Sequence, residues 1–266
     1  MAPPGFQSKV DVTFIGTATS IVSIDGVNFI TDPVFDDVGS SYDGKVIVLE
    51  SLKPPALGLH ELPAIDAVLL SHEDHPDNLD TSGRSLLNGR TVITTPDGTK
   101  NLKPRPAVHA IQAWETLSLK IGGKDFDITG TPCVHVPGGE TTGFIVHAPS
   151  FGTSPDGLPN AIYLSGDTVY FEELAQMRQK FHIVLAIINL GGVIVPGPDG
   201  PLQITLDGKS AVKLIQDIGA DVVVPIHFDS WSHFVEPSTE SAKVFVEAGL
   251  EDKVVWLKPG VATRIL

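Results

Sequence analysis

Two histidines and three acidic residues lie within six consecutive positions, directly after the apolar run 67–70. These five residues are His72, Glu73, Asp74, His75 and Asp77. Imidazole and carboxylate groups bind zinc and similar divalent ions, and they act as general bases near neutral pH. The carboxylates of so dense a cluster repel one another unless a bound cation neutralises their charge. The segment therefore predicts a metal site, and the alternative is a solvated turn that caps a helix.

Three further polar residues stand where an apolar run ends. His135 precedes a Pro-Gly-Gly turn, Asp167 follows the run 161–164, and His227 follows the run 222–225. One histidine after a strand is more often a hydrogen-bonded core residue than a ligand. Together with the cluster that starts at His72, the chain has four apolar runs that end in such a polar residue, and four are harder to explain by packing. α/β folds place their sites at the carboxyl ends of strands. We expect these side chains to meet.

The elements that must position these residues are short strands in the first half and strands with interleaved helices in the second. Strands are predicted over 10–15, 21–24, 27–30, 45–49, 67–70, 91–94, 117–121, 126–129, 143–147, 161–164, 183–188, 222–225 and 254–257. Helices are predicted over 80–87, 171–180, 210–218 and 240–248, with a Gly/Pro loop over 191–201. No stretch has the composition of a flexible linker, so we expect one α/β domain spanning residues 1–266.

The composition excludes several classes of function. The 266 residues are 42% hydrophobic, which excludes a disordered chain, and the net charge of −14 disfavours nucleic acid and anionic membranes as partners. One cysteine, Cys133, allows no intrachain disulfide, and no signal-peptide pattern or membrane-spanning run is present. We therefore expect a cytoplasmic protein that acts on a small molecule. The oligomeric state stays open.

The order of these motifs resembles the metallo-β-lactamase superfamily over nearly the whole chain. The segments 14–19, 31–35, 165–168 and 225–228 are similar to the branch that includes ascorbate-6-phosphate lactonases and N-acyl-phosphatidylethanolamine phospholipases D. The resemblance implies a four-layer αβ/βα sandwich, in which two mixed sheets lie face to face with helices outside. It also implies that Asp32 braces the metal loop from below.

The metal loop departs from the family motif His-x-His-x-Asp-His. Without a gap, Asp74 takes the place of the second histidine and Pro76 that of the aspartate, so a ligand is lost. With one inserted residue, His75 and Asp77 take those places and Asn78 replaces the last histidine. We prefer the second alignment and keep Asp74 as the alternative ligand. Since an amide is a weak ligand, the second ion is in question.

The resemblance then implies a role for each residue. His72, His75 and His135 would hold a first ion, Asp77 and His227 a second, and Asp167 would bridge them. Zinc suits these ligands, as one or two ions, with manganese or iron as alternatives. A metal-bound hydroxide would attack a carbonyl carbon, and Asp77 would orient it and pass a proton to the leaving group.

The substrate class is expected to be a small carbonyl compound such as a lactam or lactone. Tyr170, Trp231, His233 and Phe234 are predicted to contact it, with ordinary packing as the alternative for the aromatic residues. A phosphodiester hydrolase is the second hypothesis, although the motif loops contain no lysine or arginine. The third is a degenerate member that binds a metal or ligand without turnover.

Overall fold

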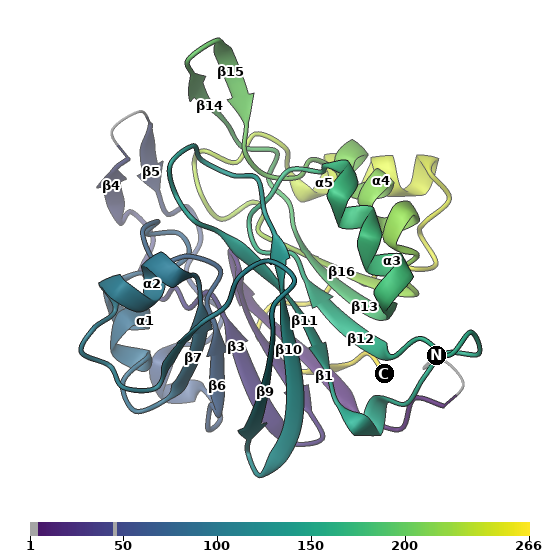
Figure 1. Cartoon of the computed structure of the whole chain (residues 1–266). Helices are drawn as coiled ribbons and strands as arrows, with labels where there is room; N and C mark the ends of the chain where they lie inside the picture. The colour runs from purple at the N-terminus through teal and green to yellow at the C-terminus, as the bar shows by residue number, and fades with distance from the viewer. Residues whose placement is uncertain (1–4, 45–46) are drawn as a thin grey trace.

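Two mixed β-sheets lie face to face in the computed structural model, which describes residues 5–44 and 47–266 (Figure 1). The first sheet has seven strands in the order β17-β1-β2-β3-β6-β7-β8. Their bounds are β1 Val10–Gly16, β2 Thr19–Ile24, β3 Val27–Thr31, β6 Ala67–Leu69, β7 Thr91–Thr94, β8 Val108–Ala110 and β17 Thr263–Arg264. β3, β6, β7 and β8 run parallel, so their carboxyl ends share one edge.

The second sheet has six strands in the order β16-β13-β12-β11-β10-β9. Their bounds are β9 Thr116–Ile121, β10 Lys124–Pro132, β11 Thr142–His147, β12 Asn160–Leu164, β13 His182–Asn189 and β16 Val222–Ile226. β12, β13 and β16 are parallel. Two small hairpins, β4 Ser41–Asp43 with β5 Val48–Glu50 and β14 Ile194–Gly197 with β15 Gly200–Gln203, project at the upper end in Figure 1.

The main core lies between the two sheets. Alternating apolar side chains of the facing strands meet there, as the edge-to-face pair Phe29 and Phe126 illustrates, with ring centroids 5.0 Å apart. Because this core holds the two sheets face to face, the strand ends that carry the polar motifs lie at a common edge.

Helices cover the outer face of each sheet. α1 Thr81–Leu86 and α2 Pro96–Asn101 lie over the first sheet, while α3 Met177–Lys180, α4 Gly208–Ile218 and α5 Ser238–Glu247 lie over the second (Figure 1). α4 presents Leu214, Ile215 and Ile218 to the sheet, one apolar stripe at helical spacing. The predicted four-layer αβ/βα sandwich is thus confirmed.

Several elements differ from the sequence prediction. Only the end of the helix expected over 171–180 is α-helical, because Glu172–Gln176 winds as a 3₁₀-helix. The strand expected over 254–257 is a single bridge from Val254 to Val223. The loop expected over 191–201 contains most of the β14–β15 hairpin. Of the strand expected over 45–49, residues 45–46 lie outside the described part, and β5 begins at Val48.

Gly83 in α1 allows the helix to pack closely on the chain after β3. A Cβ atom at Gly83 would lie 1.8 Å from the carbonyl oxygen of Pro33, and the Gly83 amide donates to Asp80 Oδ1. We expect Gly83→Ala to lower the free energy of unfolding by roughly 3 kcal/mol, because backbone must move to admit the methyl group. Urea unfolding checks this, with the exposed neighbour substitution Ser85→Ala as control; equal stability of both variants would contradict the close packing.

Within residues 5–44 and 47–266, no helix combines the length and apolar character needed to cross a membrane.

Candidate metal centre

Three histidines meet at the shared edge of the two sheets. His72 and His75 come from the loop after β6, and His135 comes from the loop after β10. His75 Nδ1 lies 2.9 Å from His72 Nε2 and 3.3 Å from His135 Nε2. A tetrahedral zinc ion with Zn–N bonds of 2.0–2.1 Å would separate its ligand atoms by about 3.3 Å. Among the described residues, these three form the one set of His, Cys, Asp or Glu side chains whose ligand atoms all lie within 4.8 Å of one another.

The protonation of this cluster suits a cation. Burial and the neighbouring His75 hold the pKa of His72 well below its usual range, and the same two causes lower the pKa of His135. His135 donates from Nδ1 to the carbonyl oxygen of Ile204 over 2.7 Å, which leaves the lone pair of Nε2 facing the cluster. Neutral imidazoles held in one tautomer by a second hydrogen bond are what metal ligation requires.

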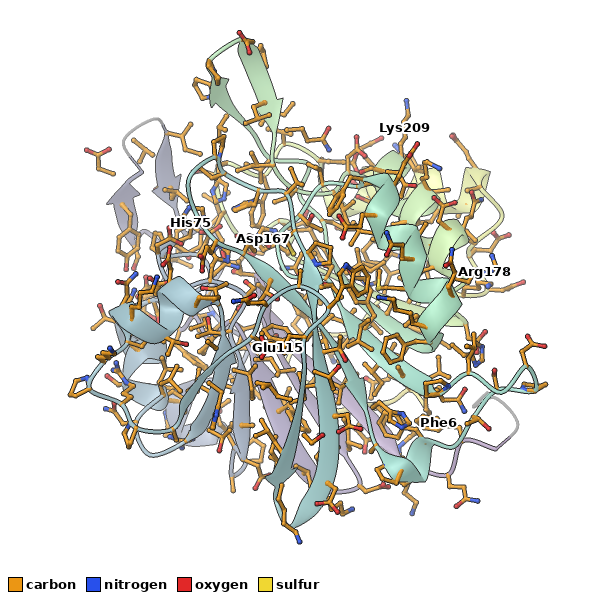
Figure 2. All side chains as sticks on the ribbon, in the orientation of Figure 1. Phe6, His75, Glu115, Asp167, Arg178 and Lys209 are labelled. Atoms are coloured by element: carbon orange, nitrogen blue, oxygen red, sulfur yellow. The ribbon has the colours of Figure 1, made fainter. Side chains whose placement is uncertain are left out.

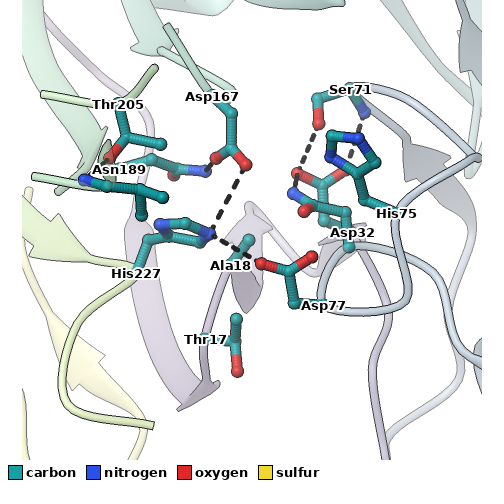
Figure 3. A network of polar contacts seen from close by, with 12 residues as sticks. Thr17, Ala18, Asp32, Ser71, His75, Asp77, Asp167, Asn189, Thr205 and His227 are labelled. Atoms are coloured by element: carbon teal, nitrogen blue, oxygen red, sulfur yellow. Dashed lines mark hydrogen bonds and ion pairs between the residues drawn. The ribbon is translucent and has the colours of Figure 1, made fainter. Parts of the chain in front are cut away.

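Two carboxylates and a fourth histidine lie beside this cluster. His227 Nε2 is 3.4 Å from Asp167 Oδ2 and 3.8 Å from Asp77 Oδ2, as the dashed lines in Figure 3 mark. Asp167 Oδ2 is also 4.0 Å from His135 Nε2, so this carboxylate lies between the two groups. Figure 2 shows Asp167 and His75 close together below the hairpins.

Opposite charges hold this second group together. Burial alone would lower the pKa of His227, but the carboxylates of Asp167 and Asp77 outweigh it and raise that pKa to about 9. Although burial opposes it, the imidazoles of His227 and His233 hold the pKa of Asp77 well below its usual range. The carboxylates are therefore ionised at neutral pH, and a divalent cation would find two anionic oxygens here.

His227 is placed by strained backbone. Its φ is +63°, in the left-handed region, where a non-glycine residue costs on the order of 1–3 kcal/mol. The His227 amide donates to the carbonyl oxygen of Thr17 over 2.7 Å, and Nδ1 donates to the carbonyl oxygen of Leu190 over 3.0 Å. Nε2 is buried and has no hydrogen-bond partner. These contacts direct Nε2 toward Asp77 and Asp167.

The structure distinguishes between the two alignments of the metal loop. It places His75 beside His72 and His135, whereas Asp74 is exposed at the surface. Glu73 accepts a hydrogen bond from Asn101 of α2 and lies outside the histidine cluster. Asn78 is fully buried and donates to Asp32 Oδ2 over 3.3 Å.

Asp32 braces the loop as the resemblance implied. It accepts hydrogen bonds from the amide of Ser71 at 2.6 Å and the hydroxyl of Ser71 at 2.8 Å, and burial raises its pKa to about 7. The same hydroxyl, whose contact with Asp32 is drawn in Figure 3, lies 2.8 Å from His72 Nδ1, so a chain of contacts runs from Asp32 to the candidate ligand.

We expect Asp32→Ala to lower the free energy of unfolding by about 2–4 kcal/mol, because it leaves buried donors of Ser71 and Asn78 unpaired. Metal affinity should fall about 10- to 100-fold, since His72 loses its support. Chemical denaturation and competition with a zinc chelator measure the two effects, with the exposed substitution Asp37→Ala as control. Unchanged metal affinity would mean that His72 is positioned without Asp32.

A cavity of about 700 Å³ opens above the candidate ligands. Its upper wall is apolar and comes from the two hairpins and the loops beside them: Ile47, Leu49, Val136, Val193, Val195 and Ile204. Six acidic residues and one basic residue, Arg84, also line it. The cavity thus has a polar floor and an apolar wall.

Of the four residues predicted to contact substrate, His233 lines this cavity. Tyr170 instead donates to Asp217 of α4 over 2.5 Å. Trp231 is buried and donates to Thr17 Oγ1, and Phe234 packs between His227 and His233. For these three aromatic residues the structure therefore gives packing and support rather than contact with the cavity, because their side chains are engaged elsewhere.

Two residues of the site were missed from the sequence. Asn189 donates from Nδ2 to Asp167 Oδ1 over 2.6 Å and so orients that carboxylate. It ends the apolar strand β13, the same signal that pointed to Asp167 and His227. Arg84 lies on α1, and its guanidinium donates to the carbonyl oxygen of Glu73. Nothing in the spacing of the sequence indicates that α1 borders the cavity.

The fold and this arrangement of histidines and carboxylates define a class of protein. The model of the beta-lactamase superfamily domain matches residues 27–228. The chain therefore belongs to the metallo-β-lactamase superfamily.

Particular relatives are distant. The chain is 27% identical over 274 residues to an uncharacterised protein of Mycobacterium tuberculosis, with 98% of this chain and 70% of that protein covered. It is 24% identical over 268 residues to the mitochondrial N-acyl-phosphatidylethanolamine-hydrolyzing phospholipase D of Saccharomyces cerevisiae, covering 94% of this chain but 54% of that one. A UPF0173 metal-dependent hydrolase of Pyrobaculum calidifontis is 27% identical over 204 residues, which cover 74% of this chain and 80% of that protein.

Solved structures agree on the fold. A possible metal-dependent hydrolase from Veillonella parvula superposes with a TM-score of 0.78 at 18% identity, over 97% of this chain and 100% of that one. Igni18, a metallo hydrolase from Ignicoccus hospitalis, superposes with a TM-score of 0.72 at 21% identity. The match covers 97% of this chain and 99% of that one. At these identities the likeness supports the architecture alone.

Proposed function

We propose that this protein is a metal-dependent hydrolase of a small, neutral carbonyl compound. The observation that carries the proposal is the preformed cluster of His72, His75 and His135, with two ionised carboxylates beside it, on the floor of a cavity. The metal dependence of the Pyrobaculum relative supports it. Because a fold by itself does not define a reaction, the site residues carry the argument.

Zinc fits the donors present. The three histidines would hold a first ion, Asp77 and His227 would contribute to a second, and Asp167 would bridge them, with manganese or iron as alternatives. The chemistry that such ions supply when bound is activation of water and polarisation of a carbonyl oxygen. The buried Nε2 of His227, which has no hydrogen-bond partner, is consistent with this assignment.

The chain's own groups would handle the proton and the substrate. Asp77 is ionised and buried at the cavity floor, so it accepts a proton from the attacking water and returns it to the leaving group. Asn189 orients Asp167. The apolar wall formed by Ile47, Val193 and Val195 would hold the hydrocarbon part of the substrate and exclude water from its carbonyl.

Charge favours a cyclic ester or amide over a phosphodiester. The cavity is lined by six carboxyl groups and one guanidinium group, and the guanidinium of Arg84 is already engaged by Glu73. A phosphodiester carries a permanent negative charge, and apart from the ions themselves the lining offers one guanidinium group, that of Arg84, to balance it, whereas a neutral lactone or lactam needs no such partner.

Metal content and a substrate panel test the proposal. The protein is purified without added metal, its bound metals are measured, and the zinc form is assayed with lactones, lactams and a chromogenic phosphodiester. We expect bound zinc and hydrolysis of at least one lactone or lactam that a chelator abolishes. Faster hydrolysis of the phosphodiester would favour the second hypothesis. Bound metal without turnover of any compound would favour a non-catalytic binding protein.

A further inference from the structure

Of the described residues that line the cavity, Arg84 carries the one guanidinium group. It stands in the last turn of α1, the helix that follows the metal loop, and its guanidinium donates from Nη2 to the carbonyl oxygen of Glu73. Glu73 lies between the candidate ligands His72 and His75 in the sequence. The guanidinium is therefore anchored to the metal loop itself, on the lining of the cavity in which the proposed reaction would take place.

The contact with Glu73 engages only one nitrogen of this side chain. A guanidinium group is always charged and has five N–H donors in a fixed plane. Nε and Nη1 of Arg84 have no partner among residues 5–44 and 47–266, and unlike the buried Nε of Arg90 they are accessible. Arg84 also takes part in none of the ion pairs of the described chain. Its remaining donors are therefore free to bind a ligand in the cavity.

The backbone of Arg84 is held firmly. Its amide donates to the carbonyl oxygen of Asp80 over 2.9 Å, and its carbonyl oxygen accepts a hydrogen bond from Arg105 Nη2 over 3.0 Å. The neighbouring Gly83 packs against the backbone of Pro33, where even a Cβ atom would not fit. A donor whose backbone and one nitrogen are already fixed loses little conformational freedom when it binds a ligand. Arg84 is thus suited to recognition.

The cavity offers different surroundings to different parts of a substrate. Ile47, Val193 and Val195 form an apolar wall at the hairpins, whereas Arg84 comes from α1, which lies below the hairpins in Figure 1. A volume of about 700 Å³ is ample for a ligand larger than a bare lactone or lactam ring. A substrate with its carbonyl at the candidate ligands can therefore place a hydrocarbon part against the hairpins and a polar part against Arg84.

We propose that Arg84 determines specificity by donating a hydrogen bond to a second oxygen atom of the substrate, separate from the carbonyl group that is hydrolysed. This inference rests on the proposed function, because it takes the substrate to be a neutral carbonyl compound bound at the metal centre. It narrows the substrate class to lactones and lactams that also carry a hydroxyl or keto group. Arg84 binds this group and takes no part in the proton transfers.

Paired substrates test the role of Arg84. The assay uses γ-lactones whose alkyl side chain carries a hydroxyl or keto group at successive positions, each paired with the lactone that has a methylene group there. We expect the wild type to prefer at least one oxygenated lactone by about 10- to 100-fold in kcat/KM, the range for a hydrogen bond to a charged group. Arg84→Met should lose this preference, and Arg84→Lys, which keeps a cationic donor, should recover part of it.

Arg90→Met is the matched control. The guanidinium of Arg90 also donates to main-chain carbonyl oxygens, those of Leu86 and Asn88, but it does not line the cavity. The variant should therefore keep the wild-type preference. Bound zinc and the circular dichroism spectrum are measured for every variant, and we expect both to match the wild type in Arg84→Met.

The outcomes separate the two proposals. If Arg84 only supports the metal loop, Arg84→Met will lose zinc or lose activity equally on both members of each pair, and either result would overturn the role in specificity. A wild type that prefers none of the oxygenated lactones would overturn it as well, while hydrolysis of the plain lactones would leave the proposed function intact. No bound metal, or no turnover of any lactone or lactam, would contradict the proposed function and the role of Arg84 with it.

Discussion

Replacing His135 by alanine is expected to reduce zinc at the first site to background and kcat/KM by about 10³-fold or more, which corresponds to about 4 kcal/mol. The reason is geometric: His135 comes from the second sheet, whereas His72 and His75 come from the first. Without it, the first ion would keep two imidazoles of one loop and, from the second sheet, only the carboxylate of Asp167. Metal analysis of the dialysed variant and steady-state kinetics on the best substrate of the panel measure both effects.

A second substitution provides the control for loss of an imidazole. His60→Ala removes an exposed histidine of the 3₁₀-helix Leu59–Glu61, and metal content and activity should stay at the wild-type level. If His135→Ala kept its first ion, the hydrogen bond from His135 to Ile204 would have only a structural role, and the three-histidine site would be excluded.

Asp77→Asn is expected to lower kcat by about 10²- to 10⁴-fold, the range associated with loss of a positioned general base. The amide has the same shape but cannot accept the proton, and it weakens the contacts to His227 and His233. Since the pKa of Asp77 is held well below its usual range, the wild-type carboxylate stays ionised throughout the neutral range. The deficit should therefore be the same at pH 6 and at pH 8.

Kinetics at both pH values, with zinc bound to each variant verified, check this expectation. Asp97→Asn, an exposed change in α2, serves as control. A deficit that disappears when excess zinc is added would assign Asp77 to metal binding alone. A kcat equal to that of the wild type would remove Asp77 from the mechanism.

The fold could be predicted in outline because its signals are local. The apolar run 67–70 contains β6, Ala67–Leu69, and Asp80 caps α1 by accepting from the Gly83 amide. α2 escaped prediction because Pro96-Asp97-Gly98 is typical of a turn. Here Thr95 caps a helix that has proline in its first turn. The β14–β15 hairpin was hidden for the same reason, since its four-residue arms contain Gly197, Gly200 and two prolines.

The candidate site was predictable only as far as each ligand follows a strand. His72, His135, Asp167 and His227 all carry that signal, and parallel strands bring their ends to one edge. The contact between His233 and Asp77 depends on the path of a loop after β16, which no periodicity records. Tyr170 shows the converse: it stands three residues after Asp167, yet it points to Asp217 of α4.

The bonds that anchor the end of β16 also bear on the order in which the molecule assembles. The carbonyl oxygen of Thr17 accepts a hydrogen bond from the His227 amide, and its Oγ1 accepts one from the Trp231 indole. Thr17 and Trp231 are 214 residues apart in the sequence. Contacts between such distant segments form late in folding, since a long loop must close first. A chain still emerging from the ribosome can bring His72 and His75 together and already contains Thr17, but it lacks His227. The second ion would therefore bind only after the two sheets have packed together, so a bound second ion would indicate a fully folded chain.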